Sequence, residues 1–72
     1  MKILISEHAR ERIEQRKISQ LKVYATVKNP ETSDESYRNR ILLRRNFGLK
    51  TLEVVIKVEN SCIIIISAYY LE

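Results

Sequence analysis

The apolar residues change their spacing at Pro30, and this change constrains the fold more than any other feature of the sequence. Before Pro30 they recur three or four positions apart, as on one side of a helix, whereas the later stretch TLEVVIKVE alternates as a strand does. Because proline disfavours helical geometry in the residue before it, the helical part has to end near Asn29. The sequence therefore predicts an α+β domain whose helices precede most of its strands.

The predicted order of the elements is β-α-α-β-β-β, and the polar stretch PETSDES is interpreted as a connection. The expected ranges, in chain order, are residues 2–5, 7–17, 20–29, 37–47, 51–59 and 62–70. Ser6 and Ser19 precede the two helices and can cap their first amides. Gly48 and the pair Asn60–Ser61 predict tight hairpins. Short hairpins favour an antiparallel sheet with both helices packed on one face, which leaves the other face open.

The short length of the chain limits its architecture. Seventy-two residues bury too little surface for two cores, so we expect residues 1–72 to form one domain. No apolar segment approaches the roughly 20 residues that span a bilayer, and no export signal is visible. These features predict a cytoplasmic protein without a membrane partner. The single cysteine, Cys62, lies in the apolar run CIIII and is expected to pack as a small hydrophobic residue. No metal site and no cofactor are expected.

The positive charge is concentrated in one segment. The formal net charge is +4, and no acidic residue occurs between Tyr37 and Leu52. The arginines of this segment, which are candidates for binding RNA, are Arg38, Arg40, Arg44 and Arg45. The segment is expected to be a basic strand, on which the side chains of Arg40 and Arg44 share a face. A basic balance favours a polyanionic partner without identifying one.

A histidine and two arginines line up on the first predicted helix. His8, Arg12 and Arg16 are spaced four positions apart and therefore lie in one narrow sector, while the glutamates of the helix lie on the opposite side. A helix that needs only solubility usually interleaves opposite charges four positions apart, so this separation of charge favours a site. The alternative is a solvated edge whose arginines pair with strand carboxylates such as Glu53 or Glu59.

The end of the chain supplies further candidates. Ser67 and Tyr69 share a face of the last predicted strand, and Tyr70 points to the other face. A tyrosine beside basic residues can hold a phosphate or stack on a base. The alternative is that these aromatic residues pack within the sheet.

The stretch SEHARERIEQRKIS resembles the opening signature S-x-H-A-x-x-R-x-x-x-R-x-I-S of a small bacterial family of unknown function. The later NPE, LEVVIKV and IISAYY follow in the order expected for that family. The family is similar to the RelE/ParE-like toxins and to the wider group of barnase- and colicin-type ribonucleases. This resemblance implies two N-terminal helices on an antiparallel sheet, action on RNA that includes ribosome-bound messenger RNA, and a cognate antitoxin protein as partner.

The resemblance also implies site residues. His8, Arg12 and Arg16 match the signature positions, Ser67 matches a hydroxyl position and Tyr69 matches the aromatic position that follows it. Lys17 occupies a position where the family often has glycine. The implied chemistry is metal-independent RNA cleavage, in which His8 acts as base or acid and Tyr69 orients or protonates. On this hypothesis the phosphates are bound by Arg12, Arg16, Arg40 and Arg44.

Three functions are compatible with these residues. The first is a RelE-like ribonuclease or translation inhibitor. The second is a non-catalytic module that binds RNA or a protein through the basic strand and the open sheet face. The third is a ParE-like toxin that acts on a protein. A homodimer is compatible with each of them, because a sizeable apolar patch on so small a monomer favours association.

Overall fold

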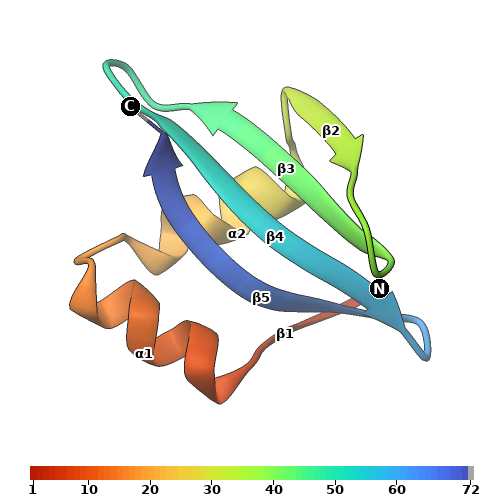
Figure 1. Cartoon of the computed structure of the whole chain (residues 1–72). Helices are drawn as coiled ribbons and strands as arrows, with labels where there is room; N and C mark the ends of the chain where they lie inside the picture. The colour runs from red at the N-terminus through yellow and green to blue at the C-terminus, as the bar shows by residue number, and fades with distance from the viewer. Residues whose placement is uncertain (72) are drawn as a thin grey trace.

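A computed structural model describes residues 1–71 of the chain, with two helices and five strands (Figure 1). In chain order they are β1 (Lys2–Ile5), α1 (Glu7–Gln15), α2 (Gln20–Lys28), β2 (Thr32–Glu35), β3 (Arg40–Asn46), β4 (Thr51–Glu59) and β5 (Cys62–Leu71). The predicted α+β class and the predicted order of the helices relative to the first and last strands are confirmed. Neither helix is long and apolar enough to cross a bilayer within these described residues.

The five strands form one mixed sheet in the order β1-β5-β4-β3-β2. The last four strands pair antiparallel, as was predicted for β3, β4 and β5. In contrast, β1 pairs parallel with β5, from Lys2 opposite Cys62 to Ile5 opposite Ile65. The expectation of a purely antiparallel sheet was therefore wrong at this edge. Because β1 and β5 come from opposite ends of the chain, no hairpin determines their relative direction.

The strand β2 lies in the stretch that was interpreted as a polar connection. Its four residues, with the sequence TSDE, are all polar and exposed. The stretch therefore lacks the alternation of apolar residues that would predict a strand. Its backbone pairs with β3, and Asp34 forms an ion pair with Arg44. The strand therefore forms because of its neighbour and not because of its own composition.

Both helices begin at the serines that were predicted to cap them. Ser6 Oγ accepts a hydrogen bond from the Ala9 amide at 3.1 Å, and Ser19 Oγ accepts one from the Lys22 amide at 3.4 Å. These bonds satisfy amides that have no partner within the helix. Because Ser19 follows soon after Gln15, the last residue of α1, the connection to α2 is short.

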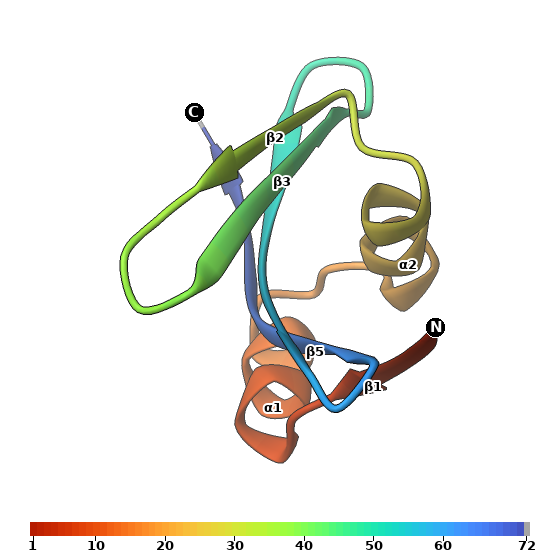
Figure 2. The same cartoon turned by 90° about the vertical axis from the view of Figure 1, so that its right-hand side faces the viewer.

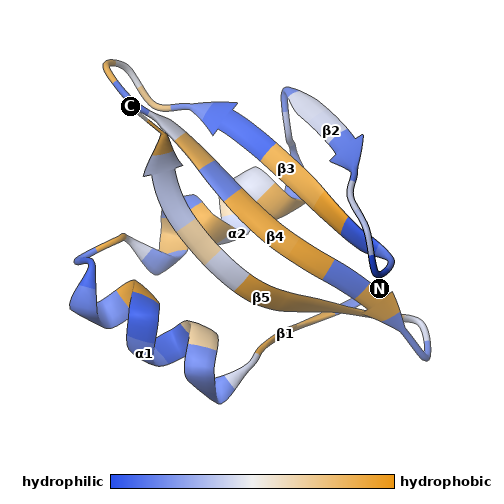
Figure 3. Ribbon diagram, in the orientation of Figure 1, coloured by the Kyte–Doolittle hydropathy of each residue, from blue (hydrophilic) through white to orange (hydrophobic). Residues whose placement is uncertain are grey.

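The hydrophobic core lies on one face of the sheet, between the strands and both helices. Its fully buried members include Ala9 and Ile13 from α1, Val23 from α2 and Ile65 from β5. Most of α1 is hydrophilic, whereas the first half of β5 is apolar throughout (Figure 3). The core thus depends on the strands more than on α1, which contributes only a thin apolar stripe.

Helix α1 lies along the part of β5 that β1 does not cover. The pairing with β1 ends at Ile65, and beyond that residue Arg16 Nη1 donates to the Ala68 carbonyl oxygen at 2.9 Å. A β-bulge at Ile66 bends β5 between these two regions. In the side view, α2 lies to the right of the sheet and α1 lies below it, next to β5 (Figure 2). Arg16 therefore satisfies a strand edge that would otherwise face water.

The hairpin turns use residues with left-handed backbone conformations. Gly48 (φ 87°) and Asn60–Ser61 (φ 50° and 61°) lie in the turns that were predicted there. Arg38 and Asn39 (φ 61° and 60°) form a further tight turn between β2 and β3. The basic strand therefore begins at Arg40 and not at Tyr37, and Arg38 belongs to a turn.

Helix α1 ends in a left-handed residue that is not glycine. Lys17 has a φ of 56°, and its amide donates to the Glu14 carbonyl oxygen at 3.1 Å while the Ile18 amide donates to the Ile13 carbonyl oxygen at 3.0 Å. This pair of bonds is the Schellman motif, in which glycine is the preferred residue because it has no Cβ. A lysine side chain strains this conformation.

We expect Lys17→Gly to stabilise the protein. Relief of the left-handed strain outweighs the greater flexibility of glycine in the unfolded chain, for a net gain of about 0.5–1 kcal/mol in the free energy of unfolding. Urea unfolding followed by circular dichroism measures this gain. Lys17→Ala is the control, because it removes the same charge but keeps the strain and should give no such gain. A Lys17→Gly variant no more stable than Lys17→Ala would contradict this explanation.

Candidate functional site

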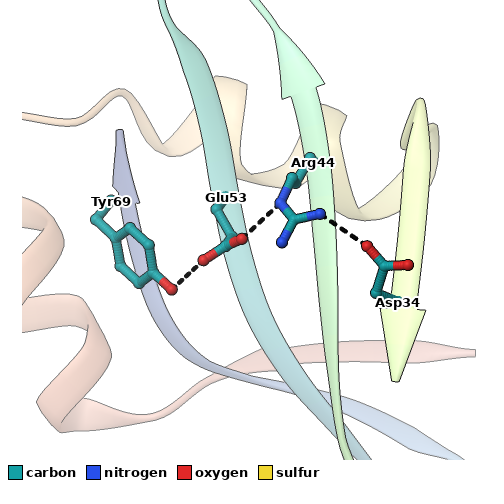
Figure 4. Close-up of polar contacts among 4 residues, drawn as sticks. All are labelled: Asp34, Arg44, Glu53 and Tyr69. Atoms are coloured by element: carbon teal, nitrogen blue, oxygen red, sulfur yellow. Dashed lines mark hydrogen bonds and ion pairs between the residues drawn. The ribbon is translucent and has the colours of Figure 1, made fainter. Parts of the chain in front are cut away.

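A row of four polar side chains crosses the open face of the sheet. The register places Arg44 of β3, Glu53 of β4 and Tyr69 of β5 directly opposite one another, and Asp34 lies on the neighbouring strand β2 (Figure 4). Side chains opposite each other in an antiparallel sheet point to the same face. The row therefore lies on the face away from the core, and it joins four strands.

Glu53 is the centre of this row. Its Oε1 accepts a hydrogen bond from Arg44 Nε at 2.6 Å, and its Oε2 accepts the hydroxyl proton of Tyr69. Arg44 also donates from Nη1 to Asp34 Oδ2 at 2.7 Å. Although it lies on the open face, Glu53 is only 5% exposed, because Arg44 and Tyr69 flank it on both sides. A buried carboxylate requires such partners.

The row raises the pKa of two of its members, Tyr69 and Arg44. Burial, together with the hydrogen bond to Glu53, raises the pKa of Tyr69 to about 12. The hydrogen bond to Glu53 also raises the pKa of Arg44. Tyr69 therefore keeps its proton at neutral pH and donates it to Glu53, and Arg44 stays charged.

Arg16 lies beside the Tyr69 end of the row. Besides holding the Ala68 carbonyl oxygen, its positive charge acts to lower the pKa of Tyr69 against the larger effects of burial and Glu53. Arg16 and Tyr69, two of the residues predicted for the catalytic site, are thus brought together by the docking of α1 on β5. Only one of the N–H donors of Arg16 takes part in a hydrogen bond with another described residue.

His8 and Arg12 are exposed on α1, on the same side of the helix as Arg16. The helical rise places Arg12 about 6 Å and His8 about 12 Å from Arg16 along the helix axis. The predicted cluster is therefore a line along α1, with only its last member at Tyr69. Ser67 lies on the open face with Tyr69, as the alternation of side chains along a strand predicted, and it is opposite Val55.

The basic residues of β3 and its turn do not form one patch. Arg44 is engaged by two carboxylates, and Arg40 lies on the same face at the other end of the strand, near the turn that carries Arg38. Arg45 points to the helix side, where its Nη1 donates to the Asn29 carbonyl oxygen at 2.7 Å and its guanidinium lies 5.8 Å from the Phe47 ring centre. The structure thus brings Arg40 and Arg38 near each other and separates Arg45 from both.

The sequence did not predict Glu53 or Asp34 as members of the site. Glu53 was considered only as a partner for the helix arginines, whereas in the structure it binds a strand arginine. The sequence did contain a sign of a polar site at Glu53. This residue interrupts an otherwise apolar strand, on the face that also carries Lys57. Asp34 gave no such signal, since its strand was not predicted.

A family model described as Domain of unknown function (DUF4258) matches residues 5–70. No curated protein and no solved structure matches the chain. The match covers both helices, the three strands from β2 to β4 and most of β5, and therefore includes every member of the row across the sheet.

Stability should depend on pH through Tyr69. The pKa of this residue is about 12 in the folded protein against about 10 in the unfolded chain, so its contribution is fully present below pH 10 and is lost as the pH rises through 12. We expect the stability difference between wild type and Tyr69→Phe to be constant below pH 10 and to shrink above it. Urea unfolding over this pH range measures the difference. A difference that stays constant throughout would contradict the hydrogen bond.

The central carboxylate should contribute measurably to stability. Glu53→Gln removes the negative charge that Arg44 and Tyr69 share, and we expect the free energy of unfolding to fall by about 1–3 kcal/mol. Glu59→Gln is the matched control on the same strand, because the exposed pair of Glu59 and Lys57 should contribute less than about 0.5 kcal/mol. Equal effects of the two substitutions in urea unfolding would show that the row does not stabilise the sheet.

Proposed function

We propose a function from the premise that the chain belongs to the DUF4258 family. On this proposal it is a RelE-like, toxin-type protein that binds RNA on its open sheet face and inhibits translation. The description of the family names no activity. Support for the proposal comes from the charges and hydrogen-bond donors that border the open face.

The observation that carries the proposal is the position of Arg16. Its guanidinium is held at the β5 edge by the Ala68 carbonyl oxygen, close enough to Tyr69 to influence its pKa. A guanidinium fixed in this way keeps donors that match the oxygens of a phosphate. Arg12 and His8 continue the same side of α1, so an RNA backbone that follows the helix would meet three basic or polar groups in succession.

The row across the sheet shapes this surface. Because Asp34 and Glu53 neutralise Arg44, phosphate binding falls to the cations at the two ends of the open face and not to its centre. Arg12 and Arg16 lie at one end, and Arg38 and Arg40 lie at the other. A single strand that reaches from one end to the other would place its bases over the centre of the sheet.

Metal-independent RNA cleavage is the second candidate. It is favoured by the closeness of Arg16 to Tyr69 and by the hydrogen bond from Tyr69 to Glu53. In this reaction the ribose 2′-oxygen attacks the adjacent phosphorus and the bond from phosphorus to the 5′-oxygen breaks. A base takes the 2′-hydroxyl proton, and an acid protonates the departing 5′-oxygen. Arg16 would stabilise the charge that develops on the phosphorane.

The same geometry favours binding over cleavage. Both oxygens of Glu53 already accept hydrogen bonds, which weakens it as a base, and Tyr69 holds its proton against Glu53, which suits an orienting role. His8, the remaining candidate for base or acid, lies about 12 Å along the helix from Arg16. Cleavage would therefore require the RNA to place its scissile phosphate near His8 and away from Tyr69.

A protein partner belongs to the proposal as well. A RelE-like toxin acts with a cognate antitoxin, and the half-buried apolar side chains of Leu42, Val55 and Ile64 on the open face offer a surface for a protein or for a second copy of the chain. A non-catalytic module that binds RNA or protein and a ParE-like toxin that acts on a protein target are the alternatives that share this surface.

Arg16→Ala should weaken binding to a fluorescent single-stranded RNA about 10-fold, because one phosphate contact is lost. For the same reason, the logarithm of the association constant should fall less steeply with the logarithm of the salt concentration, by about 0.7 in slope. Arg10→Ala is the matched control, since Arg10 lies on the opposite flank of the same helix and carries the same charge. Fluorescence anisotropy at several salt concentrations measures both quantities. Equal effects of the two substitutions would show that net charge, and not the Arg16 position, governs binding.

A cell-free translation reaction separates inhibition from cleavage. We expect the wild-type protein to reduce synthesis and Arg16→Ala to restore it. Intact messenger RNA during inhibition supports binding alone, whereas cleaved messenger RNA that becomes intact with His8→Ala supports the ribonuclease. Undiminished synthesis with the wild-type protein would contradict a translation inhibitor.

A further inference from the structure

The turn between β2 and β3 carries an aromatic ring that the core does not use. Tyr37 is 79% exposed, although tyrosine rings are usually at least half-buried. The turn itself is ordered by two backbone bonds, from the Arg40 amide to the Tyr37 carbonyl oxygen at 3.4 Å and from the Ser36 amide to the Arg40 carbonyl oxygen at 2.8 Å. The ring is thus presented to solvent by a defined turn.

The two residues after Tyr37 adopt a costly backbone conformation. Arg38 and Asn39 have φ angles of 61° and 60°, the combination of a type I′ turn, in which asparagine and glycine are preferred. An arginine at the first of these positions strains the turn. Its guanidinium lies 5.8 Å from the centre of the Tyr37 ring, over one ring face. The opposite ring face is left for another planar group.

Beside this ring lies a pocket of about 280 Å³ on the open face of the sheet. Its floor is apolar, formed by Leu42 and Val55, which stand opposite each other on β3 and β4. The turn supplies one wall and Arg40 another. Among residues 1–71, which the structure describes, no carboxylate lines the pocket, so its rim is positively charged. An apolar floor, a free aromatic face and two guanidinium groups together match a nucleotide, whose base is flat and apolar on its faces and whose phosphate is anionic.

We infer that this pocket is a subsite for an unpaired base of single-stranded RNA, with the base stacked on Tyr37 and the adjoining phosphates held by Arg38 and Arg40. The inference rests on the proposed function and narrows its substrate class, because a base within a duplex offers no free face for stacking. Arg40 lies four residues from Arg44 on one strand face, which is about 13 Å. The pocket therefore holds a different nucleotide from the one near Tyr69.

The test compares binding of a short fluorescent single-stranded RNA with binding of the same strand annealed to its complement. We expect the wild-type protein to prefer the single strand and Tyr37→Ala to weaken that binding roughly 10- to 100-fold. Tyr37→Phe and Tyr37→Trp, which keep a ring, should bind as the wild type does. Leu49→Ala is the matched control, because Leu49 is a fully exposed apolar residue at a different hairpin and should leave binding unchanged.

The possible results separate the two proposals. If the wild type binds the single strand but Tyr37→Ala binds equally well, or if Leu49→Ala loses as much, the subsite is wrong and the proposed function stands. If Tyr37→Ala weakens duplex binding to the same extent, stacking on an unpaired base is also wrong. If the wild type binds neither RNA, the proposed function fails and the subsite fails with it. Because Tyr37 is highly exposed, circular dichroism should show that every Tyr37 variant is folded.

Discussion

The carboxylate of Glu53 is the interaction on which the open face depends. It lies in β4, which has a paired strand on each side. The cost of burying this carboxylate is offset by the hydrogen bonds that Arg44 and Tyr69 supply from those two strands. Asp34 extends the same arrangement to β2 through Arg44. This polar row distinguishes the open face from the core face, since neither helix could cover it without burying further charge.

The row also determines where an anion can bind. Its single guanidinium is paired with two carboxylates, so the row has no unpaired cation, and the remaining cations lie at the two ends of the face, on α1 and on the turn between β2 and β3. Arg16 stabilises the edge of β5 by donating a hydrogen bond to the Ala68 carbonyl oxygen. The same bond holds its guanidinium beside Tyr69, where we propose that it binds phosphate. The same sheet can thereby offer positive ends for phosphates and a centre without a free cation, over which bases can lie.

Much of the fold follows from local features of the sequence. The serine caps, the turns at Gly48 and Asn60–Ser61 and the alternation in β4 are each decided by neighbouring residues, and each was predicted. The strand β2 and the parallel pairing of β1 depend on partners distant in the chain, which local patterns do not reveal. A four-residue polar strand in particular carries no hydrophobic signal.

The site likewise combines features that neighbouring residues decide with features that distant partners decide. The shared side of His8, Arg12 and Arg16 and the shared face of Ser67 and Tyr69 follow from periodicity alone. Which strand face meets α1, and that Arg44 would be neutralised by Glu53, depend on the register between β3, β4 and β5. Periodicity states which residues lie together on one element, but not what faces them across the sheet.

Binding of RNA across the open face is tested most directly by nuclear magnetic resonance of the arginine side chains. The Nε–H signals of Arg16, Arg38 and Arg40 should shift when single-stranded RNA is added, because these residues border the open face. The signals of Arg10 and Arg45 should not shift, since these side chains lie on the far flank of α1 and on the helix side of the sheet. Shifts at Arg45 without shifts at Arg16 and Arg40, or no shifts at all, would contradict the proposal.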